Sequence, residues 1–214
     1  MLKPVLLSLA LALGVSQVSI AQDQSQETDQ PSVKSGYFHS FDVNFNKAFL
    51  TTGNYLLAGI HTTHGYNFTP GLSAGLGIGV EQEIYENLQR DTYETGNIYL
   101  PVFTDVKIYL TKGTLRPFIS QVVGYTFCVY QEGFDRHTRY NNQLGGIMAN
   151  PNFGFKINLG QNTAFNISIG YRFQEYTTKN IFYNNGQGLV YYNGKTYKFS
   201  GNANYLTIKT GLTF

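Results

Sequence analysis

Over most of its length the chain alternates between apolar residues and small or polar residues with a period of two. From residue 72 to residue 84, one set of alternate positions is apolar except at Gln82, and the other set holds only small or acidic residues. Successive side chains of a β-strand point to opposite faces, so this period indicates strands whose faces lie in different environments. The alternation therefore predicts an all-β fold.

Eight segments share this pattern. They cover about residues 36–47, 54–68, 71–86, 97–111, 115–131, 144–160, 163–178 and 203–214. Each exceeds the roughly 9–11 residues that a tilted strand needs to cross a bilayer. Eight is an even number and the smallest common size of a transmembrane barrel. We therefore expect an eight-stranded antiparallel up-and-down transmembrane β-barrel over residues 36–214.

The connections between these segments alternate in length. Short turns at 69–71, 112–114 and 160–162 follow the even strands, and longer links near 47–53, 87–96, 132–143 and 179–202 follow the odd ones. Outer-membrane barrels have short periplasmic turns and longer extracellular loops. The pattern places both ends of the chain on the periplasmic side.

The first 35 residues predict export followed by a tether. Lys3 gives a positive start, an apolar run follows, and Ser19 and Ala21 put small residues where a signal peptidase reads. We expect a cleaved signal peptide over 1–21, because its apolar run is well short of the ~20 residues of a spanning helix. Residues 22–35 carry almost no apolar side chains, which predicts a disordered periplasmic tether.

The polar face of the strands decides between a membrane barrel and a soluble one. It carries four acids and four bases, namely Asp42, Glu81, Glu83, Asp105, Lys107, Lys156, Arg172 and Lys209. Equal numbers of acids and bases allow ion pairs to form inside a lumen, where an unpaired charge would be costly. A closed barrel also bonds every backbone group internally, as lipid requires. We expect this polar network in the lumen, outer-membrane lipid against the apolar face, and the bacterial outer membrane as the location.

Three proline residues do not fit regularly hydrogen-bonded strands, because each lacks the N–H group that would donate to the strand ladder. Pro117 can open its strand, and Pro101 is expected near a loop. Pro151 falls well inside a predicted strand. We expect a bulge or irregular pairing there.

Three stretches with regular alternation, residues 71–79, 99–110 and 116–125, resemble the outer membrane protein beta-barrel domain family that is common in Bacteroidota. The resemblance covers roughly residues 36–214 and implies a small outer-membrane barrel. The last strand, with apolar Leu206, Ile208 and Leu212 before the terminal Phe214, is similar to the signal read by the outer-membrane insertion machinery. Thr210 departs from that pattern.

Enzymatic eight-stranded barrels exist, which makes the histidines catalytic candidates: His39, His61, His64 and His137. A hairpin about Pro70 sets Gly59 opposite Glu81 and brings His61 diagonally within reach of Glu81. A lipid hydrolase needs a histidine beside a serine on the outer wall, whereas His61 faces inward. We therefore expect no catalytic site, and a lipid-modifying enzyme is a distant alternative.

Other site classes lack support in the sequence. The histidines are scattered and the single cysteine, Cys128, cannot form an internal disulfide, so no metal spacing is present. A net charge of +2 gives no case for a nucleic-acid partner. The glycines at 75–79 open no helix and predict room for opposing side chains. We expect no cofactor.

One predicted loop, residues 179–202, is rich in Tyr, Asn and Gly, which is typical of adaptable contact surfaces. Its candidate contact residues are Tyr183, Tyr191, Tyr192 and Tyr197. The leading hypothesis is a non-enzymatic barrel with a side-chain-filled polar lumen and a structural or surface-interaction role. A narrow pore or small-ligand transporter, and a secreted soluble binding barrel, are the alternatives to it.

Overall fold

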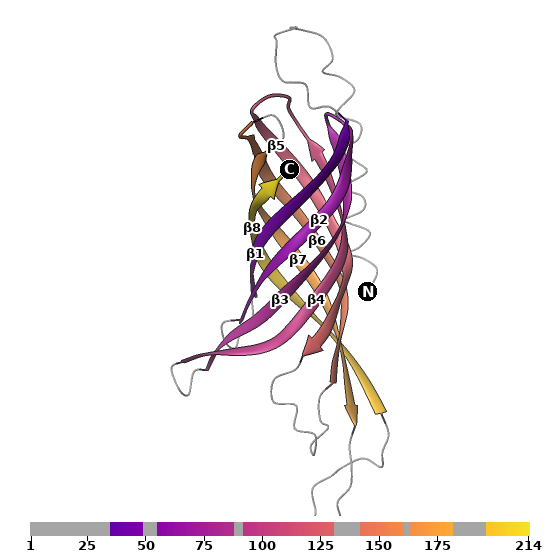
Figure 1. The fold of residues 1–214 in the computed structure, drawn as a ribbon. Helices are drawn as coiled ribbons and strands as arrows, with labels where there is room; N and C mark the ends of the chain where they lie inside the picture. Colours follow the sequence, from indigo (N-terminus) through magenta and orange to yellow (C-terminus); the bar gives the residue numbers. More distant parts are fainter. Residues whose placement is uncertain (1–34, 49–54, 88–91, 131–141, 161–162, 182–195) are drawn as a thin grey trace, which may run out of the picture.

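The computed structural model is a closed β-barrel, and it describes residues 35–48, 55–87, 92–130, 142–160, 163–181 and 196–214 (Figure 1). Its strands are β1 (Gly36–Ala48), β2 (Tyr55–Thr69), β3 (Leu72–Asn87), β4 (Thr92–Tyr109), β5 (Leu115–Tyr130), β6 (Asn142–Asn158), β7 (Ala164–Ile181) and β8 (Thr196–Thr213). Each strand pairs with the next, and β8 pairs antiparallel with β1 to close the barrel. The predicted eight-stranded antiparallel fold is confirmed.

Two hairpins reach further than the sequence predicted. β4 begins at Thr92, β7 ends at Ile181 and β8 begins at Thr196, so the predicted links at 87–96 and 179–202 are partly strand. The β3–β4 and β7–β8 hairpins extend beyond their neighbours at the lower end of the barrel in Figure 1. Their residues are mostly polar or glycine, and apolar alternation is limited to a few positions such as Tyr197 and Phe199, so the sequence predicts loops there.

Short connections gather at the other end, which we call the turn end; the end opposite is the loop end. Gly113 adopts a φ of 124° in the β4–β5 turn, a conformation that favours glycine. The turns are bonded to neighbouring strand ends, since Tyr109 N at the end of β4 donates to Gly71 O at 2.8 Å and Asn158 N at the end of β6 donates to Thr114 O at 2.8 Å. Paired backbone bonds between His39 and Phe214 hold the C-terminus at the same end.

Pro101 lies inside β4, not near a loop as predicted from the sequence. The β3–β4 pairing runs to Ile78↔Val102 and resumes at Glu81↔Tyr99 in the same register. On the β5 side, Pro101 pairs with Thr126 without a break. Proline has no N–H, so it interrupts the ladder on one edge only.

Pro151 has the same effect in β6. Its β5 edge is paired, with Gln121 as partner, while the β6–β7 pairing passes from Ala149↔Phe173 to Asn152↔Gly170. The register is unchanged across this gap. The irregular pairing expected at Pro151 is therefore an interruption and not a bulge.

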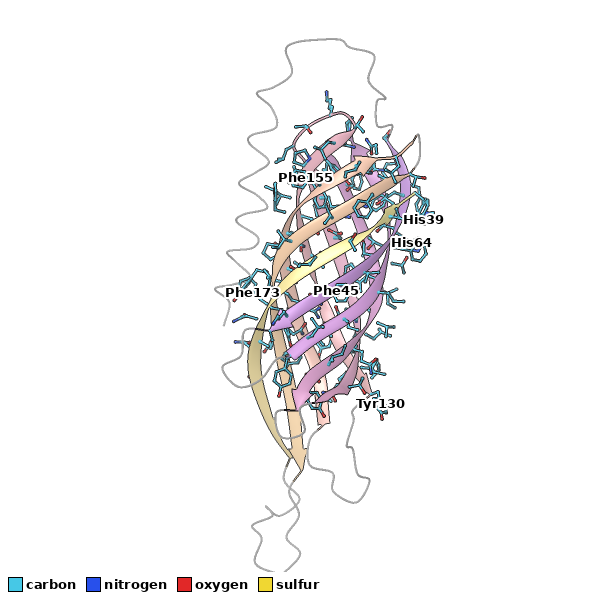
Figure 2. The ribbon with its side chains drawn as sticks, turned by 90° about the vertical axis from the view of Figure 1, so that its left-hand side faces the viewer. His39, Phe45, His64, Tyr130, Phe155 and Phe173 are labelled. Carbon is cyan, nitrogen blue, oxygen red and sulfur yellow. The ribbon has the colours of Figure 1, made fainter. Side chains whose placement is uncertain are left out.

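The barrel exposes its apolar side chains and buries its charged ones. Ile60 and Leu76 are 66% and 69% exposed on the outer wall, whereas Glu81 and Arg172 are 0% and 2% exposed inside. Aromatic side chains such as Phe45, Phe155 and Phe173 also project outward (Figure 2). A continuous apolar outer surface of this kind is stable only against apolar surroundings. In the described part of the chain, no helix has the length and apolar character to span a membrane.

Candidate functional site: a polar network across the lumen

A row of inward positions on β1, β2 and β3 begins the network. Gly59 pairs with Glu81, as the hairpin about Pro70 predicted, and on its other side Gly59 pairs with Asn44. Because Gly59 has no side chain, Asn44 Nδ2 reaches past it and donates to Glu81 Oε1 at 2.8 Å. A Cβ at position 59 would lie 2.7 Å from Glu81 Cγ, so this approach requires glycine.

His61 reaches the same carboxylate oxygen from the diagonal position, as expected from the sequence. Its Nε2 lies 3.1 Å from Glu81 Oε1. The ring occupies the space above Gly79, where a Cβ would be 2.1 Å from His61 Cδ2. Gly77 leaves similar room for the Phe103 ring. The glycines of β3 therefore accommodate opposing side chains, as predicted.

Arg172 contacts Glu81 from the opposite wall of the barrel. Its Nη1 donates to Glu81 Oε1 at 2.6 Å. In the closed order of eight strands, β3 and β7 are four strands apart and lie opposite each other. This ion pair therefore crosses the full width of the lumen.

The rest of the Arg172 guanidinium is also bonded. Nε and Nη2 donate to Gln174 Oε1 at 3.1 and 2.8 Å, and Nη2 donates to Thr126 Oγ1 at 3.2 Å. Gln174 Nε2 in turn donates to the carbonyl of Gly146 at 3.3 Å. Charge-assisted bonds of this kind are stronger than neutral ones. We call Asn44, His61, Glu81, Thr126, Arg172 and Gln174 the Glu81 network.

A tyrosine layer lies on the loop side of this network. Tyr99 and Tyr205 are buried with Ala48 and Leu57, and the Tyr176 and Tyr205 hydroxyls are hydrogen-bonded. Glu83 lies beside this layer and accepts from Asn97 Nδ2 at 3.0 Å. Glu83 is thus held by an amide, not by one of the predicted basic partners.

The charges on the turn side of the network are arranged differently. Lys107 Nζ lies 3.3 Å from Asp105 Oδ2, and Asp42 accepts from Ser40 Oγ at 3.3 Å. Lys209 reaches across from β8 to β4, where its Nζ lies 5.8 Å from the centre of the Phe103 ring. Lys156 Nζ lies 5.5 Å from the centre of the Tyr109 ring. All eight predicted charges point inward, but only Glu81–Arg172 and Asp105–Lys107 form ion pairs with each other.

Several interior residues were missed by a search for charged positions: Asn44, Thr126, Gln174 and Arg116. The first three are neutral and carry no signal until their partners are known. Arg116 is completely buried, and its alternation with Phe118 and Ser120 places it on the inner face. The alternation of side chains along β5 is therefore a sequence signal that could have predicted the inward orientation of Arg116.

The surface-contact candidates are not brought together by the described part of the structure. Tyr183, Tyr191 and Tyr192 lie outside the described residues. The backbone of Tyr197 belongs to β8 and pairs with Asn180, so this residue extends a strand instead of lying in a loop. Within the described ranges, no group of three or more metal-ligating side chains is present.

Comparisons with known proteins bear on the fold. No protein-family model and no curated protein matches the sequence. Among solved structures, the chain is similar to the outer membrane protein OprG from Pseudomonas aeruginosa, with a TM-score of 0.58, 15% identity and coverage of 86% of this chain and 98% of that one. Neisserial surface protein A gives a TM-score of 0.56 at 12% identity, covering 84% and 97%. The outer membrane protein AlkL gives 0.54 at 11% identity, covering 90% and 95%. The chain has the fold of the eight-stranded outer-membrane barrels.

Proposed function

We propose that this protein is a non-enzymatic outer-membrane barrel whose lumen is closed by its own side chains, with a structural or surface-interaction role. The Glu81–Arg172 ion pair carries the proposal, since it joins side chains from opposite walls across the lumen at 2.6 Å. Phe103 and Lys209 meet across the lumen on the turn side of it. Barrels of eight strands are just wide enough for side chains to fill.

The outer-membrane location is supported by the apolar outer wall and by the fold. The leader at 1–21, the tether at 22–35 and the resemblance to the Bacteroidota barrel family fit the same location. In this proposal the turn end faces the periplasm and the loop end faces outward. The test is to fractionate cells and run the detergent-extracted protein on a gel with and without boiling. We expect it in the outer-membrane fraction with a heat-dependent shift in mobility; recovery from the soluble periplasm would contradict the location and favour a secreted barrel.

We further propose that β8, ending beside Phe214, is the strand read by the insertion machinery. Phe214 is exposed on the outer wall and stacks on His39, with ring centres 5.1 Å apart. Phe214→Ala should lower the amount of folded protein in the outer membrane. Phe68→Ala, which removes another exposed outward phenylalanine, is the matched control and should leave that amount nearly unchanged. An equal loss in both variants would contradict a special role for the last strand.

A lipid-modifying enzyme is the alternative with the clearest chemical requirements. Among the described residues, His61 contacts Glu81, and His64 contacts the Tyr37 and Thr62 hydroxyls. No described histidine is hydrogen-bonded to a serine, which supports the non-enzymatic proposal. Lipid A from cells expressing the protein, or its His61→Ala variant, should match lipid A from cells lacking it. A product that depends on His61 would overturn the proposal.

The glycines of β3 are the feature that favours the alternative of a narrow pore or small-ligand transporter. Phe103 and His61 occupy the space over Gly77 and Gly79. Liposomes containing the protein should therefore swell no faster in small sugars than empty liposomes do. Faster swelling would favour the transport alternative.

A further inference from the structure

Two basic side chains face each other on the inner wall at the turn end. Arg116 of β5 and Lys156 of β6 are register partners in adjacent strands. Arg116 is 0% exposed and Lys156 is 7% exposed, so both are buried. Like charges directly opposite each other in a sheet are destabilising.

Neither side chain has an acidic partner. Among the described residues, no carboxylate oxygen lies within 4.0 Å of the Arg116 or Lys156 nitrogens. Lys107, on the neighbouring β4, is already held by Asp105 at 3.3 Å. The Arg116–Lys156 pair is thus an excess of positive charge that the described chain does not neutralise.

The bonds of Arg116 leave one nitrogen free. Nε donates to the carbonyl of Thr111 at 3.2 Å, and Nη2 donates to the carbonyl of Pro70. Nη1 is buried and has no hydrogen-bond partner. Buried polar groups are almost always bonded, so a charged donor without a partner points to a missing acceptor.

The Tyr109 ring fixes the two cations relative to each other. Arg116 Cζ lies 4.2 Å from the ring centre and Lys156 Nζ lies 5.5 Å from the same centre. Contacts with an aromatic face stabilise a cation but supply no acceptor for its N–H groups. The ring therefore holds both cations at a common wall, and Arg116 Nη1 remains without an acceptor.

We propose that the turn end of the lumen binds a small soluble oxyanion, a phosphate or carboxylate group, between Arg116 Nη1 and Lys156 Nζ. Guanidinium and ammonium donors are the usual recognition groups for such anions. A soluble anion fits better than a lipid headgroup, because both cations are on the inner wall and acyl chains would lie against the outer one. The inference goes beyond the proposed function and does not depend on the extracellular loops.

The test uses the mature protein folded in an uncharged maltoside detergent, with inorganic phosphate as the probe. Binding is measured by isothermal titration at constant ionic strength, and the unfolding temperature is measured with and without phosphate. Lys156→Gln removes one of the two charges while keeping a side chain of similar length. Lys112→Gln, an exposed turn residue at the same end of the barrel, is the matched control. Acetate replaces phosphate in a second arm to test carboxylate binding.

We expect phosphate to raise the unfolding temperature of the wild type and of the Lys112→Gln control. Lys156→Gln should bind phosphate at least about tenfold more weakly, as expected for loss of one charge-assisted contact. Without phosphate, Lys156→Gln should unfold at a higher temperature than the wild type, because the repulsion from Arg116 is gone. A purely structural lysine would not give these two opposite changes.

Other results would overturn the proposal. Equal stabilisation of all three proteins by phosphate would show a general salt effect, and no stabilisation of any would show the absence of a site. Failure to bind phosphate or acetate, combined with saturable binding of phosphatidylglycerol in mixed micelles, would assign the charges to lipid instead. Arg116→Gln serves as a second variant, and loss of its fold would leave the Lys156→Gln comparison unaffected.

Discussion

The loop-side and turn-side halves of the lumen hold their charges in different ways. In the Glu81 network, one carboxylate oxygen accepts from Asn44, His61 and Arg172, and the remaining Arg172 donors reach Gln174 and Thr126. In the turn-side half, Arg116, Lys156 and Lys209 lie against aromatic rings without a carboxylate within 4.0 Å among the described residues. Both halves place these residues at inward-facing positions of the barrel strands.

This difference shows that an inward charge can serve two purposes in one barrel. Where acid and base meet at the same level on opposite strands, the charge joins the walls and closes the lumen. Where bases outnumber the acids nearby, as at Arg116 and Lys156, the interior carries a local positive charge that attracts an anion. The two halves should therefore respond in opposite ways to the loss of a cation.

Arg172→Met should have the largest effect. It leaves Glu81 buried without its cation, which typically costs about 3–5 kcal/mol in the free energy of unfolding. Denaturant titration of the protein in lipid vesicles measures the change. The double variant Glu81→Gln/Arg172→Met should lose less than Arg172→Met alone, since no uncompensated carboxylate is left. A loss below about 1 kcal/mol for the single variant would place the pair among weak surface-like ion pairs.

Gly79→Ala should have an intermediate effect. Its new Cβ would lie 2.1 Å from His61 Cδ2 and 2.8 Å from the carbonyl of Ile60, so His61 must leave Glu81. Overpacking of this kind costs about 1–3 kcal/mol, measured by the same titration. The control is Gly36→Ala, where no atom lies within 4 Å of the added Cβ. If the two substitutions cost the same, the close approach over β3 is not a constraint.

Lys209→Met should have the smallest effect. The described contact of its Nζ is with the Phe103 ring at 5.8 Å, and an exchange for an apolar side chain of similar size leaves no unpaired acid behind. We expect the free energy of unfolding to change by less than about 1 kcal/mol. A loss as large as that of Arg172→Met would show that the two halves do not differ in the way described.

The fold was largely predictable from the sequence, and the site only in part. Alternation predicts a strand where it continues over many residues, as in 72–84, whereas in the extension from Thr196 it is too short to distinguish a strand from a loop. The alternation also predicted correctly that Glu81, Arg172 and the other charged residues face the lumen. It cannot give their partners, because pairing across a lumen depends on which strands lie opposite and on the level of each residue along a tilted barrel.

His61 and Glu83 illustrate this limit. The contact of His61 with Glu81 was predictable because one short hairpin sets the register between β2 and β3. The partner of Glu83 is Asn97, beyond a longer connection and next to a strand that begins earlier than predicted. The register between neighbouring strands can be predicted from the sequence when the turn is short, but not when the connection is longer and the start of the next strand is uncertain.

The central claim is that side chains close the lumen, with Glu81 and Arg172 joining opposite walls. Planar-bilayer recording of the purified, heat-modifiable wild-type protein tests it most directly. The account predicts no stable current above that of the unmodified bilayer. A steady, reproducible single-channel current through the folded protein would contradict it.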